Sequence, residues 1–307
     1  MQVVHFKEEY SKNKYKVDPN TLDLKFLREI CTGEFDAKKY FNESTIYKKT
    51  VFLDAPNGHF EGTAEINRFA KNWLKDFKAT KAEVHPVIQT IAGGHICNEL
   101  EIHFHLAKGG VSKVPMTIFS DPIGEDKLEG MRIYFFYQFL PGAIPYRKPI
   151  FRPVVNSWAS PAVMTGAVRY YYEQLHNYRS SEAIDNIVAM CTEDVHYGGY
   201  RPDEAEPLFI GKEALRKVYD GIMVNVPWNN YVRFETFCDD GVTCCTEWTI
   251  VVRKTALKDG FINFAGCAMY ERAKDGRLYS IRINDNAGFD PGIDRNTISD
   301  GDWFIDS

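Results

Sequence analysis

The sequence predicts an α+β protein made of two copies of one unit, each roughly 150 residues long. Three observations predict this arrangement. The chain has 307 residues, which exceeds most single compact cores but suits two ordinary domains. Four sequence blocks recur in the same order in both halves. Within each half, helix-like patterns come first and long strand-like patterns follow.

The repeat is visible in four pairs of blocks, whose offset drifts only from about 150 to about 146 residues. The pairs are 40–47 with 190–197, 60–66 with 209–215, 98–104 with 246–252, and 130–137 with 276–283. Five prolines between the copies exclude a long helix or a central strand there. We therefore expect a first domain at 1–145, a semi-stiff linker at 146–163 and a second domain at 164–307.

The elements of the second copy follow from periodicity and turn residues. Helices are predicted over 164–178, over 181–190 with Ser181 as its cap, and over 211–219, entered through Gly211. A short strand is expected near 195–197. Long strands follow, with Asp-Gly hairpin turns at 240–241 and 275–276. The strands are predicted at 231–238, 242–253, 261–272 and 278–285.

The last strand of the first copy is apolar on both faces. Met131, Ile133 and Phe135 alternate on one side, and Tyr134 and Phe136 lie on the other. A strand with this pattern is buried on both sides. We expect its second face to meet the other copy.

This order of elements resembles the NTF2-like superfamily, which includes ketosteroid isomerases, scytalone dehydratase and SnoaL-like polyketide cyclases. The recognisable parts are the glycine-led helix at 211–215 and the Asp-Gly turn before the last strand. The resemblance covers 22–140 and 165–290. It implies a cystatin-like cone: a curved antiparallel sheet wrapped around about three helices, with an apolar pocket. It also implies pairing of the two copies as an internal pseudo-dimer and leaves a further homodimer open.

Composition limits the class of function. The net charge of −5 gives no electrostatic footprint for nucleic acid. No apolar run is long enough for a membrane span, and the first ten residues do not resemble a signal peptide. The seven cysteines have irregular spacing, which predicts reduced, buried thiols in a cytoplasmic protein. No cofactor is expected.

Asp285 is the first catalytic candidate. Alternation places Tyr279, Ile281, Ile283 and Asp285 on one face of the last strand, where an apolar row would raise the pKa of the carboxyl. The alternative is a strand-end residue that caps the following turn. The first copy has Phe139 at the aligned position, which would restrict acid–base chemistry to the second copy.

His196 and Tyr197 are the other catalytic candidates, on the short strand expected at the cone mouth. Histidine titrates near neutrality, and a tyrosine hydroxyl polarises a carbonyl. The first copy has Ile46 and Tyr47 there. The ketosteroid isomerase base, which follows this strand, is replaced by Gly198 and Gly199. Half-buried strand packing is the alternative interpretation.

Aromatic and apolar residues of the second copy are candidates for ligand contact, although core packing explains them equally well. They are Trp248, Trp228, Tyr172, Tyr270 and Ile250, with Tyr47 in the first copy. His103 and His105 form an H-x-H pair on a strand, but their polar face should point away from the cone. No metal is therefore predicted, although binding by this pair stays open.

The leading hypothesis is a cofactor-independent cyclase, isomerase or dehydratase acting on a small apolar or aromatic carbonyl compound, polyketide- or steroid-like. Asp285 would move the proton, and His196 and Tyr197 would stabilise the enolate. A non-catalytic small-molecule-binding protein is the first alternative, and a protein-contact scaffold is the second. The acidic tail at 290–307 is expected to fold back through Trp303 and Phe304.

Overall fold

The computed structural model divides the chain into two compact units, Met1–Arg147 and Lys148–Ser307, here called unit 1 and unit 2. The predicted linker, 146–163, lies outside the described residues. Described are residues 17–42, 50–135, 168, 170, 171, 174, 181–198, 209–225, 230–253, 261–288 and 304–305. Side chains at 221–225, 230–235, 248–253, 261–265, 285–288 and 304–305 are outside the description.

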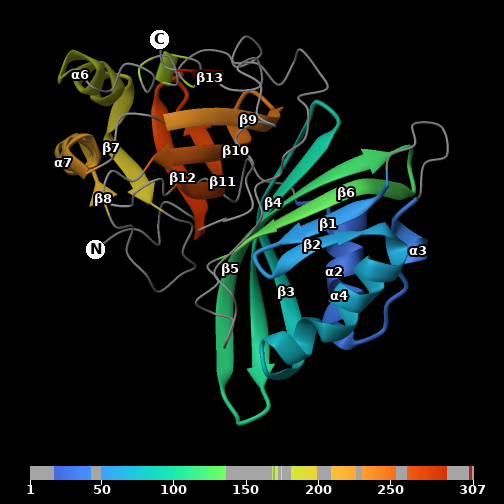
Figure 1. The fold of residues 1–307 in the computed structure, drawn as a ribbon. Helices are drawn as coiled ribbons and strands as arrows, with labels where there is room; N and C mark the ends of the chain where they lie inside the picture. Colours follow the sequence, from blue (N-terminus) through green and yellow to red (C-terminus); the bar gives the residue numbers. More distant parts are fainter. Residues whose placement is uncertain are drawn as a thin grey trace. The chain divides into compact units, whose positions relative to one another are not determined.

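Unit 1 packs helices on one face of a six-stranded sheet (Figure 1). The strand order is β2-β1-β6-β5-β4-β3; β1 and β6 are parallel, and the other neighbours are antiparallel. The helices are α2 (Leu22–Thr32), α3 (Ala37–Tyr40) and α4 (Gly62–Asp76). The strands are β1 (Phe52–Ala55), β2 (Gly58–Glu61), β3 (Ala79–Ala92), β4 (His95–Leu106), β5 (Val111–Ile123) and β6 (Lys127–Tyr134).

Unit 2 has the same layout, with strand order β13-β9-β10-β11-β12-β7-β8. Its β7 and β12 form the parallel pair. Residues 168, 170, 171 and 174 are helical, within the helix predicted at 164–178. The helices are α6 (Ser181–Ala189) and α7 (Lys212–Asn225). The strands are β7 (Cys191–Gly198), β8 (Phe209–Ile210), β9 (Asn230–Asp239), β10 (Thr243–Arg253), β11 (Phe261–Arg272), β12 (Leu278–Gly288) and β13 (Phe304–Ile305).

The two sheets confirm the prediction of two α+β copies. Read from β8 to β9, the order β8-β7-β12-β11-β10-β9 repeats the order of unit 1. The four long strands of unit 2 lie within a few residues of their predicted bounds. The short strand predicted near 195–197 lies within β7, but its pairing was not predicted: β1 and β7 each run parallel to the last long strand, so the sheets are mixed and not purely antiparallel. In the following, the inner face of a sheet is the one that the helices cover, and the outer face is the other.

A glycine starts the third helix of each copy, as the sequence predicts. Gly62 and Gly211 both have positive φ, 81° and 86°, which disfavours any residue with a Cβ. Their N–H groups donate to the carbonyls of Val51 and Val195 at 2.7 and 2.8 Å. The glycine thereby ties the start of each helix to the strand that lies parallel to the last one.

The strand registers correct part of the sequence alignment. In unit 1, Leu53 of β1 pairs with Met131 of the last long strand. In unit 2, Tyr197 of β7 pairs with Ile281 at the matching position of its last long strand, so Leu53 is the counterpart of Tyr197. The alignment of Tyr197 with Tyr47 is therefore wrong, because unit 1 has a longer segment before β1.

The last strands are also shifted relative to the sequence alignment. Thr117 pairs with Tyr134 in unit 1, and Cys267 pairs with Asn284 at the matching position of unit 2. The residue after each pair on the last strand is then Phe135 in unit 1 and Asp285 in unit 2, so the counterpart of Asp285 is Phe135 and not Phe139. The pairing of Gly130 with Gly276 is wrong for the same reason, since Gly130 matches Ser280. Glu129-Gly130 resembles the Asp275-Gly276 turn but lies inside β6, and this similarity misled the alignment because the turns preceding the two last strands differ in length.

A bulge changes the predicted faces at the start of β12. The ladder shifts register between Leu278 and Ser280. Leu278 consequently joins the inner core, and the ring of Tyr279 lies 5.3 Å from that of His196. Simple alternation had predicted the opposite faces for Leu278 and Tyr279, because it assumes an unbroken pleat.

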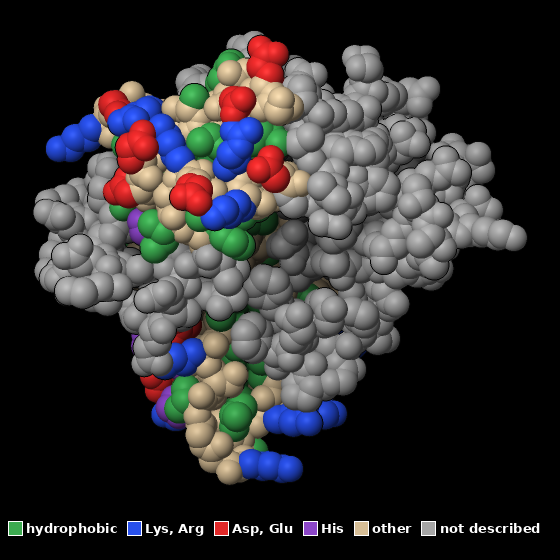
Figure 2. Space-filling view, turned by 90° about the vertical axis from the view of Figure 1, so that its left-hand side faces the viewer, with side chains coloured by type: hydrophobic (Ala, Val, Ile, Leu, Met, Phe, Trp, Pro, Cys, Tyr) green, Lys and Arg blue, Asp and Glu red, His purple; other side chains and the backbone are tan. Residues whose placement is uncertain are grey.

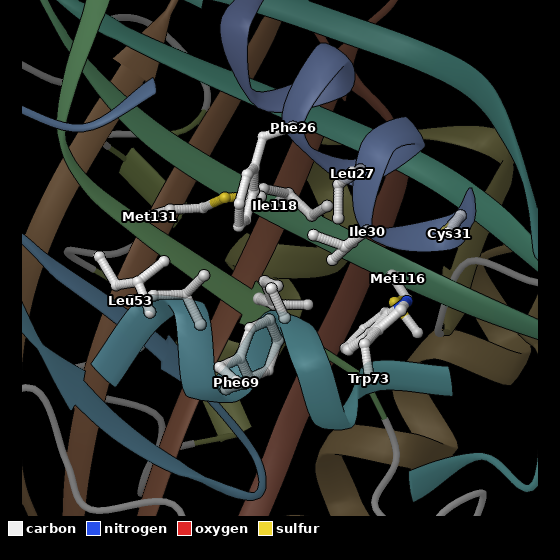
Figure 3. Packing of buried hydrophobic residues seen from close by; sticks show 14 of the residues in the cluster. Phe26, Leu27, Ile30, Cys31, Leu53, Phe69, Trp73, Met116, Ile118 and Met131 are labelled. Atoms are coloured by element: carbon white, nitrogen blue, oxygen red, sulfur yellow. The ribbon is translucent and has the colours of Figure 1, made fainter. Parts of the chain in front are cut away.

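The inner face of unit 1 is filled by large apolar side chains (Figure 3). Trp73 of α4 lies 5.1 Å from Phe77, 5.7 Å from Phe104 and 6.4 Å from Phe135, measured between ring centroids. Phe77 stacks on Phe104 at 3.8 Å. These four rings occupy the space between α4 and the far ends of β4 and β6.

The β6 strand is buried on both faces, as its apolar pattern predicts. Ile133 and Phe135 pack in the inner core, while Arg132 and Tyr134 on the outer face are 3% and 1% exposed. The pairing of the two copies sheet to sheet stays a prediction.

The C-terminal tail of unit 2 contributes an edge strand. Phe304 and Ile305 form β13 and pair with Val232 and Tyr231 of β9. The tail therefore folds back, as predicted, with Phe304 in the paired segment. Trp303 lies outside the described residues.

Candidate functional site

Tyr197 and His196 lie on opposite faces of β7, because neighbouring strand residues alternate. The ring of Tyr197 lies 5.9 Å from that of Tyr219 and packs against the inner core. His196 lies on the outer face, beside the ion pair of Arg282 with Glu271. Burial lowers the pKa of His196, although the charges of Asp194 and Glu271 oppose this. The two residues therefore do not converge on one site.

Asp285 lies within β12, which continues to Gly288, and not at the end of the strand. It pairs with Gly266 of β11, and Gly266 pairs in turn with Trp248 of β10. Residues that pair directly across neighbouring strands share a face, so positions 248, 266 and 285 form one row across the sheet. The side chains of Trp248 and Asp285 lie outside the description. The glycine leaves the central position of this row without a side chain.

The matching row of unit 1 defines the inner face and is filled. It consists of Leu100, Met116 and Phe135, all buried in the core. The next inner position of β11 is Ala268, where unit 1 has Ile118. At both central positions of this part of the sheet, unit 2 therefore has the smaller residue.

The same contrast extends to the helix and to the neighbouring strand. Aligning the helices at Gly62 and Gly211 places Ile222 of α7 at the position of Trp73. Val252 and Asp285 stand where unit 1 has Phe104 and Phe135. Three of the four clustered rings of unit 1 are thus replaced by side chains without a ring.

A cluster of tyrosines lies beside this region. Tyr270, a predicted ligand contact, is buried and its ring centroid lies 5.1 Å from that of Tyr171. Tyr171 and Tyr197 lie 6.2 and 5.9 Å from Tyr219 of α7. The structure therefore brings Tyr197 and Tyr270 into one cluster. Ile250 lies on β10, two residues from Trp248, and its side chain is outside the description, as are Trp228, Tyr172 and Tyr47 as a whole.

Tyr219 was missed by the sequence reasoning. It lies one turn after Leu215 on the buried stripe of α7 and is 2% exposed. Its hydroxyl is buried and has no hydrogen-bond partner among the described residues. Burial raises the pKa of Tyr219 far above its usual range. The sequence feature that could have identified it is a tyrosine in the apolar stripe of a helix, at the position where unit 1 has Ala70.

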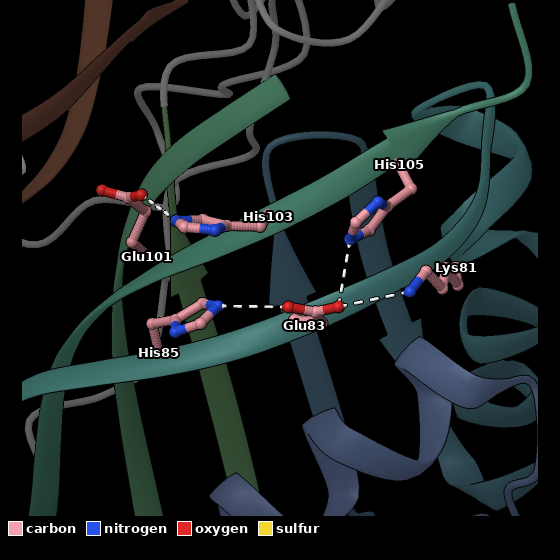
Figure 4. A network of polar contacts seen from close by, with 6 residues as sticks. All are labelled: Lys81, Glu83, His85, Glu101, His103 and His105. Carbon is pink, nitrogen blue, oxygen red and sulfur yellow. Dashed lines mark hydrogen bonds and ion pairs between the residues drawn. The ribbon is translucent and has the colours of Figure 1, made fainter. Parts of the chain in front are cut away.

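The polar face of β3 and β4 in unit 1 carries several histidines and acids (Figure 4). His103 pairs with Glu101 and its ring lies 4.0 Å from that of His85. His105 instead contacts Glu83, with 3.1 Å between Nε2 and Oε1. The two histidines of the H-x-H pair thus have different partners. Among the described residues, no group of three His, Cys, Asp or Glu side chains is arranged to hold a metal ion.

The unit 2 residues that match His103 and His105 are Val251 and Arg253, so the histidine pair is not repeated in unit 2. All seven cysteines of the chain are free and buried. This agrees with the expectation of reduced, buried thiols.

A buried acid of unit 1, Asp23, was also missed by the sequence reasoning. Asp23 lies in the first turn of α2 and is fully buried. One carboxylate oxygen accepts from the Leu24 N–H at 2.9 Å, and the other accepts from the Asn98 amide at 2.6 Å. Gln89 donates to Asn98 at 3.0 Å and extends the network to β3. Burial raises the pKa of Asp23 and outweighs these hydrogen bonds. The network joins α2 to β3 and β4, which indicates a structural role.

Charges of both signs alternate over the helices of unit 2 (Figure 2). Arg216 pairs with Asp185, and Lys212 pairs with Glu193 at 2.6 Å. This face therefore has no single-sign surface. None of the described helices combines the length and the hydropathy that crossing a membrane requires.

No protein-family model matches the sequence, and no curated protein matches it. Solved structures do match parts of the chain. The epoxide hydrolase/cyclase-like enzyme SalBIII, of pyran ring formation in the polyether salinomycin, is 14% identical with a TM-score of 0.32. That match covers 40% of this chain and 92% of SalBIII.

Two further matches are similar in extent. An NTF2-like protein of unknown function from Exiguobacterium sp. 255-15 is 12% identical, with a TM-score of 0.32 over 39% of this chain and 97% of its own. Rv0760c from Mycobacterium tuberculosis, in complex with estradiol-17beta-hemisuccinate, is 15% identical, with a TM-score of 0.30 over 39% of this chain and 93% of its own. The fold assignment of the two units depends on their strand order and their duplicated layout.

Proposed function

We propose that the inner face of unit 2 binds a small apolar or aromatic carbonyl compound, and that Asp285 transfers a proton on it. The observation that carries this proposal is the row of positions 248, 266 and 285, where unit 2 has Trp, Gly and Asp and unit 1 has Leu, Met and Phe. Gly266 and Ala268 are buried and smaller than Met116 and Ile118 at the matching positions of unit 1. Smaller residues at buried positions leave space for a ligand unless neighbours collapse into it.

The composition of the row supports a flat ligand. Neighbouring strands lie about 4.8 Å apart, so positions 248 and 285 are separated by about 10 Å, with only a glycine between them. A planar ring system placed over Gly266 would lie between positions 248 and 285, which carry a tryptophan and an aspartate. Burial of such a ring system is the main source of affinity in apolar sites.

The chemistry follows from an acid in an apolar row. Asp285 as a carboxylate would accept a proton from the carbon next to the carbonyl, and as a carboxylic acid would return it to another carbon or to a leaving oxygen. The inward position of Tyr197 supports it as a donor to the carbonyl oxygen. His196 faces the other side of β7 and is left out of this proposal. Cyclisation, isomerisation and dehydration all fit such a transfer.

The test uses the whole chain and a panel of polycyclic ketones, bile acids and polyketide-like aromatics. Ligands that bind only the folded state raise the Tm. We expect a ketone to raise the Tm of the wild type, and Gly266→Met, which copies Met116 of unit 1, to weaken its binding at least tenfold. Met116→Leu serves as the control in unit 1, because it conserves volume and leaves unit 2 unchanged. Equal binding by Gly266→Met would place the ligand elsewhere.

Catalysis is tested separately with Asp285→Asn. We expect this variant to bind the ketone but to lose exchange of the hydrogens next to the carbonyl, measured by NMR in D₂O. A specific observation favours the alternative of a non-catalytic binding protein: Gly198 ends β7 where a ketosteroid isomerase base would follow. Full exchange activity in Asp285→Asn, or no exchange in the wild type with binding intact, would favour that alternative.

A further inference from the structure

We propose that the ligand of unit 2 is uncharged and accepts a hydrogen bond from the hydroxyl of Tyr219. This proposal rests on the binding site proposed above. It adds which residue donates a hydrogen bond to the ligand, and that the ligand carries no charge.

Tyr219 is positioned next to the space that distinguishes unit 2. It lies on α7 one turn before position 222, which matches Trp73 of unit 1. In unit 1 the ring of Trp73 lies 6.4 Å from that of Phe135, whose counterpart is Asp285. The helix turn that carries Tyr219 is therefore adjacent to the turn that faces the row of Trp248, Gly266 and Asp285.

The hydroxyl of Tyr219 lacks a partner that the fold would ordinarily supply. It is buried and makes no hydrogen bond within the described part of the chain. Its ring is held by Tyr171 and Tyr197, which meet it edge-on at 6.2 and 5.9 Å. Most buried polar groups are paired, and an exception calls for a reason such as a bound molecule. At the same point unit 1 has Ala70, which carries no donor.

The charge of the surroundings defines the class of acceptor. Burial keeps the pKa of Tyr219 high, so the hydroxyl stays protonated and can donate. The buried cations described in unit 2 are already neutralised. Arg272 binds Asp239 through two hydrogen bonds of 2.9 and 2.7 Å, and Arg282 binds Glu271 at 3.0 Å.

Position 285 of the row carries an acid, and among the described residues of unit 2 no unpaired buried cation is present to balance a carboxylate ligand. Burying such an anion without a counter-charge is unfavourable. A ketone, aldehyde or ester oxygen accepts from a neutral phenol without this cost. The geometry thus points to an uncharged carbonyl compound.

The experiment compares Tyr219→Phe with wild type, using three probes of similar size: 2-tetralone, 2-naphthoate and tetralin. We expect wild type to bind 2-tetralone more tightly than either other probe, by calorimetry. Tyr219→Phe should lose about tenfold in affinity for 2-tetralone and none for tetralin. Tyr170→Phe, a change at an exposed tyrosine, is the matched control and should bind as wild type does.

The Tm without ligand gives an independent readout. Because the Tyr219 hydroxyl is unpaired, Tyr219→Phe should melt at or above the wild-type temperature. A lower Tm would show that the hydroxyl has a partner in the protein and would overturn the inference. Equal 2-tetralone binding by Tyr219→Phe, or tighter binding of 2-naphthoate, would overturn it while leaving the binding site in place. Binding of none of the probes by wild type would refute the proposed site itself.

Discussion

Unit 1 fills the space between α4 and its sheet with Trp73 and three phenylalanines, whereas unit 2 has Ile222, Val252 and Asp285 at three of these positions. The strand order around that space is the same in both units. One layout therefore accommodates two kinds of inner face: an aromatic core in unit 1, and in unit 2 the smaller side chains from which we propose a ligand site. Residue size at a few inner positions distinguishes them.

The two units share one buried ion pair on their outer faces. Arg132 of β6 pairs with Asp121 of β5, and Arg282 of β12 pairs with Glu271 of β11 at equivalent positions. Burial disfavours ionisation of Asp121, but the charge of Arg132 and the hydrogen bond with His95 outweigh it and hold the pKa below its usual range. This ion pair is therefore common to both copies, whereas the aromatic cluster of the inner face is not.

The largest expected effect comes from opening the core of unit 1. Trp73→Ala removes the central ring of four and should lower the free energy of unfolding by about 3–5 kcal/mol. An apolar cavity lined by phenylalanines stays dry and accepts small aromatic molecules. We therefore expect indole to raise the Tm of Trp73→Ala and not that of wild type, measured by calorimetry. A loss below about 1 kcal/mol would mean that the rings do not hold unit 1 together.

A smaller effect is expected where the units differ on the outer face. Gly130 pairs with Phe52, and a Cβ at position 130 would lie 2.0 Å from the Phe52 ring. Gly130→Ser should therefore cost about 1–3 kcal/mol of unfolding free energy. The matching pair in unit 2 is His196 and Ser280, so adding Phe52→His should recover part of the loss. Denaturant unfolding of both variants checks this, and a further loss in the double variant would contradict the equivalence.

The smallest effect concerns the buried acid of unit 1. The folded-state pKa of Asp23 is raised above its unfolded value of about 3.9, so the folded state holds the proton more tightly. Its contribution to stability is therefore full below the unfolded pKa and is lost as pH rises through the folded pKa. Relative to Asp23→Asn, wild type should gain stability as pH falls from 7 toward 4.

Hydrogen–deuterium exchange of peptides from α2 and β4 measures this effect within unit 1. Asp185→Asn serves as the control, because Asp185 is an exposed acid of unit 2 and should leave that exchange unchanged. A difference between wild type and Asp23→Asn that does not vary with pH would contradict the raised pKa.

The sequence alone determined the two-copy α+β layout, the glycine-led helices and the long strands of unit 2, because periodicity and turn residues are local properties. It also singled out Tyr197 and Tyr270, which the fold brings into one cluster. Strand register, by contrast, depends on pairing between distant segments. Only the tertiary structure therefore matched Asp285 with Phe135, separated His196 from Tyr197, and revealed the unpaired Tyr219 hydroxyl, since burial and hydrogen-bond partners are decided by packing.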